Sequence, residues 1–280
     1  MVLPLIRVGP AGNPVGYRGS TVNVFGKIRA MGLDAYEYQA TYGLRLKNEN
    51  AVRIHENSVK NDVLVSMHGP YYINLSSAKK ETVEKSIERL FDCVVTGKLM
   101  GAYRIVFHPG FYGEQGKAGA LDLCRRALGE LIERLHGAGI REFTLAPETT
   151  GKRSQVGSLD EIIKLSEEFD EVMPTIDFAH IHARGGGCIR DARGYMEILD
   201  RVESRLGSHQ LHCHFTGIEY TDAGERKHHS LSEGYGPPVE PLIEVLVDGG
   251  WEATIISETP MKDADAMKIK AIINEYLKRE

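Results

Sequence analysis

The chain is poor in cysteine and has no excess of positive charge. Its four cysteines, at positions 93, 124, 188 and 213, stand singly, without the close pairs that mark zinc ribbons or disulfide frameworks. This usage predicts a reducing, cytoplasmic setting. The 34 basic residues face 39 acidic ones, which gives a net charge of −5 and a pI near 6.1. A general electrostatic attraction to nucleic acid is therefore excluded, and any site for a polyanion must be local or must rest on bound cations.

Long apolar runs and a nucleotide-binding fingerprint are also missing from the sequence. No stretch approaches the roughly 20 apolar residues that a membrane span requires. The first residues, MVLPLIRVGPAG, form too short an apolar stretch for a signal peptide and have no basic region before it. The segment GPAGNPVG (9–16) does not fit the GxGxxG pattern of dinucleotide-binding folds. We therefore expect a soluble, intracellular protein without a membrane partner.

What the chain does contain is a regular alternation of two kinds of segment. Short apolar runs rich in β-branched residues predict strands, and longer segments of helical period separate them. The candidate strands span 5–9, 34–39, 63–67, 104–108, 143–148, 174–178, 210–215 and 254–258. The candidate helices span 21–32, 44–58, 77–101, 120–139, 158–169, 191–206, 237–250 and 263–280. Eight such pairs predict an α/β fold, a (β/α)8 TIM barrel that forms a single domain over residues 1–280.

The helix boundaries carry the signals that this fold requires. Ser158 followed by Glu161 resembles a capping box, and several helices run into glycine, as at Gly101. No low-complexity tract or Pro/Ser-rich linker interrupts the series. The main alternative is a doubly wound open sheet, which the missing glycine fingerprint argues against.

Acidic residues and histidines gather where the predicted strands end. In a barrel of this kind the carboxyl ends of the strands form the functional face. The segment TIDFAHIH (175–182), for example, begins like a buried strand and then presents an acid and two imidazoles. The residues at the strand ends and in the loop after the seventh strand are His68, His108, Glu148, Asp177, His180, His212, His214, His228, His229 and Glu258.

This coincidence predicts a metal centre. A single histidine at a strand end is more often a hydrogen-bonded rim residue than a ligand. Many such groups converging on one rim would be costly to bury unless cations lay between them. Imidazole and carboxylate suit Zn²⁺, with Mn²⁺ or Fe²⁺ as alternatives, and no cysteine is needed. His212 and His214 alternate within one strand and share a face, so either could be the ligand.

Seven segments carry a likeness to a known family. They are HGPYYINL (68–75), FHPG (107–110), APETTGKRSQVG (146–157), TIDFAH (175–180), HFTG (214–217), HHSLSEGYG (228–236) and SETP (257–260). In this order they resemble endonuclease IV, a family of apurinic/apyrimidinic endonucleases built on a xylose isomerase-like barrel. The likeness extends over nearly the whole chain. Within it, HFTG matches the turn that follows a family ligand, which favours His214 over His212.

The resemblance implies a cluster of two or three Zn²⁺ ions. His68 and His108 would hold the first ion, His180 and His228 the third, and Glu148 would bridge the first ion to the second. The residues that the resemblance assigns to the ions are His68, His108, Glu148, Asp177, His180, His214, His228 and Glu258.

One position departs from the family pattern. The family has an aspartate two residues before the histidine that corresponds to His228, and Arg226 stands there in the segment ERKHH (225–229). A cation cannot bind a cation. Either Glu225 or Asp222 replaces the aspartate, or the third ion is weak, or it is absent and Arg226 binds a DNA phosphate instead.

The function that the resemblance implies is hydrolysis of the phosphodiester 5′ to an abasic site in double-stranded DNA, a step of DNA repair. Divalent ions would stabilise the charge of the transition state. Glu148 would hold the first two ions together, and Glu258 would orient or deprotonate the attacking water. Tyr71 and Tyr72 would enter the duplex where the abasic nucleotide swings out. We expect this DNA-binding hydrolase to be a cytoplasmic monomer.

Two other interpretations remain open at this point. A sugar isomerase or epimerase of the same barrel superfamily would use one metal to move a proton between adjacent carbons. Such an enzyme would not need His68, His108 or His228, nor the pair of tyrosines. A non-catalytic relative that binds damaged DNA or metal would explain Arg226 as the mark of a lost third ion.

Overall fold

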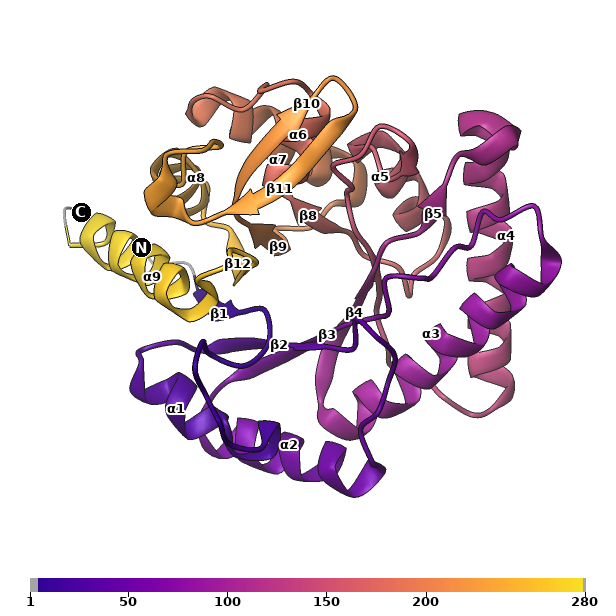
Figure 1. Ribbon diagram of the computed structural model, residues 1–280, viewed down its shortest axis with the longest axis horizontal. Helices are drawn as coiled ribbons and strands as arrows, with labels where there is room; N and C mark the ends of the chain where they lie inside the picture. Colours follow the sequence, from indigo (N-terminus) through magenta and orange to yellow (C-terminus); the bar gives the residue numbers. More distant parts are fainter. Residues whose placement is uncertain (1–4, 279–280) are drawn as a thin grey trace.

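Parallel strands close into a barrel at the centre of the protein (Figure 1). The computed structural model describes residues 5–278. Two parallel four-stranded sheets, ordered β1-β12-β9-β8 and β2-β3-β4-β6, meet through isolated bridges between Ala11 and Glu37 and between Glu148 and Thr175. The predicted (β/α)8 TIM barrel is thereby confirmed. The barrel strands are β1 (Ile6–Pro10), β2 (Ala35–Gln39), β3 (Leu64–His68), β4 (Ala102–Phe107), β6 (Leu145–Pro147), β8 (Thr175–Asp177), β9 (Gln210–Phe215) and β12 (Glu252–Ser257).

Helices surround the strands as an outer layer (Figure 1). Each predicted helix overlaps an observed one, although the last two residues of the segment 263–280 lie outside the described part. Among residues 5–278, no helix is both long enough and apolar enough to cross a bilayer. The helices are α1 (Phe25–Ala30), α2 (Asn48–Lys60), α3 (Lys80–Met100), α4 (Gly116–Gly137), α5 (Leu159–Glu168), α6 (Phe178–Arg184), α7 (Ala192–Leu206), α8 (Glu240–Asp248) and α9 (Lys262–Tyr276), with short 3₁₀ turns at Thr21–Asn23, Gly113–Gln115 and Leu231–Glu233.

Three features beyond the eight pairs were not predicted. The helix α6 begins directly after β8, with the Asp177 side chain accepting a hydrogen bond from the backbone N–H of His180. Two antiparallel ribbons also lie in the loops, one formed by β5 (Gly110–Phe111) and β7 (Gln155–Val156), the other by β10 (Gly217–Thr221) and β11 (Gly224–His229). All three features follow barrel strands, so they belong to the functional face.

Strand alternation separates an apolar layer from a polar interior. In β3, Val65 and Met67 join the hydrophobic core, whereas Ser66 and His68 hydrogen-bond to carboxylates inside the barrel. Successive side chains of a strand point to opposite faces, so one strand can serve both layers. The fold is stabilised by the apolar layer between strands and helices, which leaves the interior available for polar groups.

The predicted helix signals are present. Ser158 and Glu161 form a capping box at the start of α5, and the backbone N–H of Ser158 donates to the Glu161 carboxylate at 2.9 Å. Gly101 ends α3 with a φ of 71°, a left-handed conformation that favours glycine. These local signals place the helix ends, and with them the strands that follow.

A substitution at Gly9 can test how closely β1 approaches β2. A Cβ atom at this position would come within 1.8 Å of the carbonyl oxygen of Ala35. Because the atoms that this Cβ would meet belong to the backbone of a barrel strand, they cannot easily move aside. We therefore expect Gly9→Ala to lower the free energy of unfolding by about 1–3 kcal/mol or more. Thermal or urea denaturation measures this change. The matched control is Gly137→Ala, where a Cβ meets nothing within 4 Å, and its stability should be unchanged or slightly raised. Equal stabilities of the two variants would contradict the close approach.

Candidate metal centre

Four histidines from different segments surround one buried carboxylate. Glu148 is fully buried at the end of β6. Its Oε2 lies 3.1 Å from Nε2 of His68 and 3.0 Å from Nε2 of His108. Its Oε1 lies 3.1 Å from Nδ1 of His180 and 3.2 Å from Nδ1 of His214. The structure therefore joins residues that are up to 146 positions apart, from His68 to His214, around a single side chain.

Among the described residues, four sets of possible ligands have their ligand atoms within 4.8 Å of one another, and three of these sets contain or adjoin Glu148. We call these three sets together the His–carboxylate cluster. All eight residues predicted to bind metal are members, and Glu225 is an additional one. The sets are His68, His108 and Glu148; Glu148, Asp177, His214 and Glu258; and His180, Glu225 and His228.

Two histidines of the cluster are also held by a backbone carbonyl, in each case through Nδ1. Nδ1 of His68 lies 2.9 Å from the carbonyl oxygen of Gly69, and Nδ1 of His180 lies 2.9 Å from that of Thr149. An N–H that donates to such a carbonyl leaves Nε2 with its lone pair directed at the cluster. This arrangement, with one nitrogen fixed by an acceptor and the other turned inward, is typical of histidines that bind metal.

Two features of these groups would be satisfied by divalent ions. Among the described residues, the buried Oδ2 of Asp177 accepts no hydrogen bond and has Nδ1 of His180 as a neighbour at 3.4 Å, although a buried oxygen without a hydrogen bond is costly. Nε2 of His180 lies 3.3 Å from Nε2 of His228, so the two nitrogens cannot both carry a proton. Both an orphaned carboxylate oxygen and two facing imidazole nitrogens are groups that a divalent ion would satisfy.

The pKa values of the buried carboxylates reflect how closely charged groups are packed in the cluster. Burial raises the pKa of Glu148, but the surrounding histidines, His214 and His108 foremost, together lower it further, so that it falls well below its ordinary value. Burial raises the pKa of Asp177, and the charges of Glu148 and Glu258 add to this. Without ions, the carboxylates are balanced only by protons on the imidazoles. Divalent ions would replace those protons.

A bulge in β11 brings Glu225 into the third set. Residues three apart in a regular strand point to opposite faces. Here Tyr220 of β10 is opposite Glu225 while Glu219 is opposite Lys227, so Arg226 is the extra residue. Because of this extra residue, the side chains of Glu225 and His228 point to the same face of β11, and they come within 3.6 Å of each other. Of the two replacement ligands that the sequence left open, Glu225 is the one that lies with the histidines.

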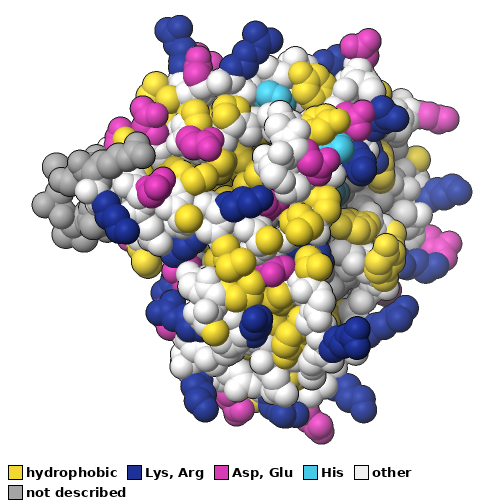
Figure 2. Space-filling model, turned by 60° about the vertical axis from the view of Figure 1, so that its left-hand side comes forward, with side chains coloured by type: hydrophobic (Ala, Val, Ile, Leu, Met, Phe, Trp, Pro, Cys, Tyr) yellow, Lys and Arg dark blue, Asp and Glu magenta, His cyan; other side chains and the backbone are white. Residues whose placement is uncertain are grey.

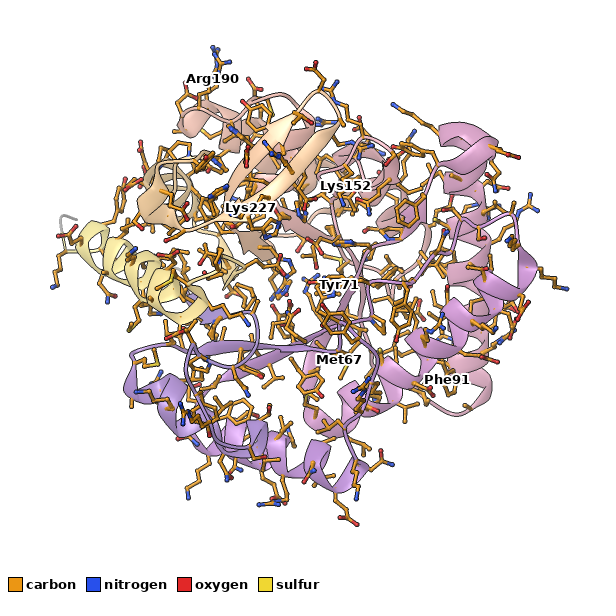
Figure 3. All side chains as sticks on the ribbon, viewed as in Figure 1. Met67, Tyr71, Phe91, Lys152, Arg190 and Lys227 are labelled. Carbon is orange, nitrogen blue, oxygen red and sulfur yellow. The ribbon has the colours of Figure 1, made fainter. Side chains whose placement is uncertain are left out.

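The residues predicted to contact DNA lie outside the cluster. Arg226 turns away, with its side chain 65% exposed and its guanidinium 2.6 Å from Glu219. Tyr71 is half exposed and its ring lies edge-on to His68, with the centroids 5.8 Å apart; Figure 3 shows it near the centre of the ring of strands. Tyr72 is also half exposed and packs under the guanidinium of Arg89. The two tyrosines thus have different surroundings, and only Tyr71 borders the cluster.

Sequence reasoning missed a fully buried carboxylate next to the cluster. Glu37, on β2, lies 3.1 Å from Nε2 of both His212 and His214. The two histidines share a face as predicted, but only His214 also reaches Glu148. The available signal was the glutamate inside the strand AYEYQ, where a tyrosine stands on each side of it and points to the opposite face. A charged residue there was easily taken for a solvent-exposed one.

Fold and cluster together define this protein as a (β/α)8 barrel with histidines and carboxylates that could hold metal ions at the carboxyl ends of its strands. A model of the xylose isomerase-like TIM barrel family matches residues 25–278. The chain belongs to this family.

Two proteins with similar sequences illustrate the relationship. An uncharacterized protein of Methanocaldococcus jannaschii is 34% identical over 253 residues, covering 89% of this chain and 90% of that one. The "Probable endonuclease 4" of Listeria monocytogenes is 26% identical over 217 residues, covering 74% and 70%. The resemblance to endonuclease IV is thus confirmed.

Two solved structures share the fold. Endonuclease IV from Thermus thermophilus superposes with a TM-score of 0.74 at 20% identity, covering 98% of this chain and 100% of that chain. A D-tagatose 3-epimerase-like protein superposes with a TM-score of 0.71 at 20% identity, covering 92% and 95%. At 20% identity the similarity supports the barrel fold alone, and the chemistry must be inferred from the residues of the site.

The third set predicts different effects for two adjacent residues. Glu225→Gln removes a ligand charge, so we expect the variant to lose about one Zn²⁺ per chain, or to hold it at least tenfold more weakly. Arg226→Ala, the matched control, changes a side chain that points away and should leave the metal content unchanged. Elemental analysis after gel filtration measures both. A full complement of zinc in Glu225→Gln, or a loss in Arg226→Ala, would show that the bulge does not build this set.

Proposed function

We propose that this protein is a metal-dependent endonuclease that hydrolyses the phosphodiester 5′ to abasic sites in double-stranded DNA, with Zn²⁺ as the resident metal. The single observation that carries the proposal is the presence of three adjoining ligand sets. A phosphodiester gains charge in its transition state at both the attacking and the leaving oxygen, so several ions in one centre suit it. The relationship to proteins named endonuclease 4 supports the same choice.

The ions would withdraw charge from the phosphodiester and supply a reactive water near neutral pH. The chain's own residues then have distinct tasks. Glu148 holds two ligand sets together through its two oxygens. Glu258 has a side chain 13% exposed and an Oε1 that lies 3.4 Å from Nδ1 of His214, so it can both orient a water and take its proton.

DNA would be bound by the exposed side chains around the cluster. Tyr71 borders His68 and offers half of its surface for stacking at the abasic position. Arg226 remains exposed beside Glu219 and can reach a backbone phosphate. Lys152 and Lys227 lie towards the β10–β11 ribbon, on one side of Tyr71 (Figure 3). On the face drawn in Figure 2, side chains of both charge signs are mixed, so the attraction to DNA would depend on the ions themselves.

A second candidate is a sugar epimerase of the same family. It is favoured by one observation, that Glu148, Asp177, His214 and Glu258 alone form a complete four-residue set for a single ion. Proton transfer between adjacent carbons requires one metal and a pair of acid–base groups. The other two sets would then have no assigned task, which is why we place this function second.

A nicking assay separates the candidates. The substrate is a synthetic duplex that contains one abasic site. We expect protein loaded with Zn²⁺ to cut the strand on the 5′ side of that site, and to lose this activity when a chelator is added. Glu258→Gln should lower the rate at least about a hundredfold, because a proton acceptor is lost. A His209→Ala control, at an exposed histidine that stacks on the buried Trp251, should not change the rate.

Three results would contradict the nuclease assignment. The first is no incision by protein loaded with Zn²⁺, Mn²⁺ or Fe²⁺. The second is epimerisation of a ketohexose by protein that holds one ion per chain. The third is tight binding of the abasic duplex without cleavage, which would identify a non-catalytic relative.

A further inference from the structure

A second buried carboxylate lies one layer deeper in the barrel than the His–carboxylate cluster. Glu37 is opposite Ser66 in the β2–β3 register, two residues before the level of His68. Ser66 Oγ donates to Oε2 at 2.9 Å, and Gln39 Nε2 lies 3.0 Å from Oε1. Nε2 of His212 lies 3.1 Å from Oε2, and Nε2 of His214 lies 3.1 Å from Oε1. None of the motifs discussed above includes Glu37.

The directions of these hydrogen bonds follow from the chemistry of the partners. A carboxylate only accepts, so both imidazoles turn an N–H towards Glu37. The hydroxyl of Tyr103 lies 2.5 Å from Nδ1 of His212 and can donate to it. His214, in contrast, has its Nδ1 3.2 Å from Oε1 of Glu148 and 3.4 Å from Oε1 of Glu258, two members of the second ligand set. With its proton held on Nε2, the lone pair of His214 is directed into the second ligand set.

We infer that Glu37 is a positioning residue that fixes the ring and tautomer of His214, so that its Nδ1 binds metal. The inference rests on the metal binding invoked for the proposed function, and it does not depend on the nuclease chemistry. Carboxylates behind a metal-binding histidine typically change metal affinity by about 10–100-fold. Glu37 contacts both histidines of β9, which differ in what their Nδ1 atoms face. Only His214 has a second nitrogen that faces the other ligands.

The same geometry argues against a further ion beside Glu37. Glu37, His212 and His214 do place ligand atoms within 4.8 Å of one another. However, four donors already approach Glu37, and a carboxylate offers about four acceptor positions. An ion there would have to displace protons from both imidazoles at once. A positioning role leaves every hydrogen bond in place.

The test compares metal binding in three variants, and activity is not its readout. Zn²⁺ affinity is measured by competition with a chromophoric chelator, and Co²⁺ spectra report the geometry around the ion. We expect Glu37→Gln to weaken one ion by about 10–100-fold and to alter the Co²⁺ bands. His212→Gln leaves the contact between Glu37 and His214 in place and should retain affinity within about threefold. Glu161→Gln, which removes a buried carboxylate at the start of α5, controls for a general loss of stability.

Each other outcome overturns the inference. Unchanged Zn²⁺ affinity and Co²⁺ bands in Glu37→Gln, with only a lower melting temperature of the metal-free protein, would make Glu37 purely structural. Loss of one whole ion in both Glu37→Gln and His212→Gln would reveal an ion beside Glu37. No Zn²⁺ binding by the unaltered protein would defeat the metal centre as well. If Glu37→Gln does not fold, Glu37→Asp keeps the charge but withdraws the oxygens, and the same weakening is expected.

Discussion

The structure depends on the contact of one buried carboxylate with four imidazoles. Glu148 is approached by His68, His108, His180 and His214, which come from separate strand ends and one helix. Bringing these groups together out of water is unfavourable unless opposite charges balance closely. The barrel provides a frame stiff enough to hold them, and divalent ions would complete the balance of charge. Site and fold are therefore coupled, because the centre contributes stability only when its charges are matched.

The barrel tolerates such a centre because its two faces have separate tasks. In β9, Leu211, Cys213 and Phe215 pack in the apolar layer, while His212 and His214 face the interior. The apolar layer supplies the burial that stabilises the fold. The inner layer can then be given to polar groups, provided that each is satisfied. Glu37 and its four donors show this condition met one layer below the ions.

How far the sequence could predict this site depended on where each residue lies in its element. His68, Glu148 and Asp177 end strands, and strand ends of a parallel barrel meet at one rim, so their convergence was predictable. Glu37 lies within a strand, where inward and outward acids look alike until the register is known. Glu225 was one of several alternatives, beside Asp222 and a weak or absent third ion, because the sequence predicted only a loop there and a loop does not fix which side chains meet. Only the bulge at Arg226, which follows from the β10–β11 pairing, resolves that choice.

The acidic composition of the chain is compatible with the proposed polyanionic substrate because of the charges at the cluster itself. The ligand sets contain four carboxylates, from Glu148, Asp177, Glu225 and Glu258. Three divalent ions would outweigh them, so the rim would become locally positive although the chain alone carries a net charge of −5. Attraction would then be confined to the place where chemistry occurs, since charges beyond about 8–10 Å are screened at cellular salt. A basic surface would bind any DNA, whereas a local positive centre favours substrates that can bring a phosphate into it. An abasic nucleotide, with no base to hold it in the stack, swings out of the duplex at lower cost than an intact one.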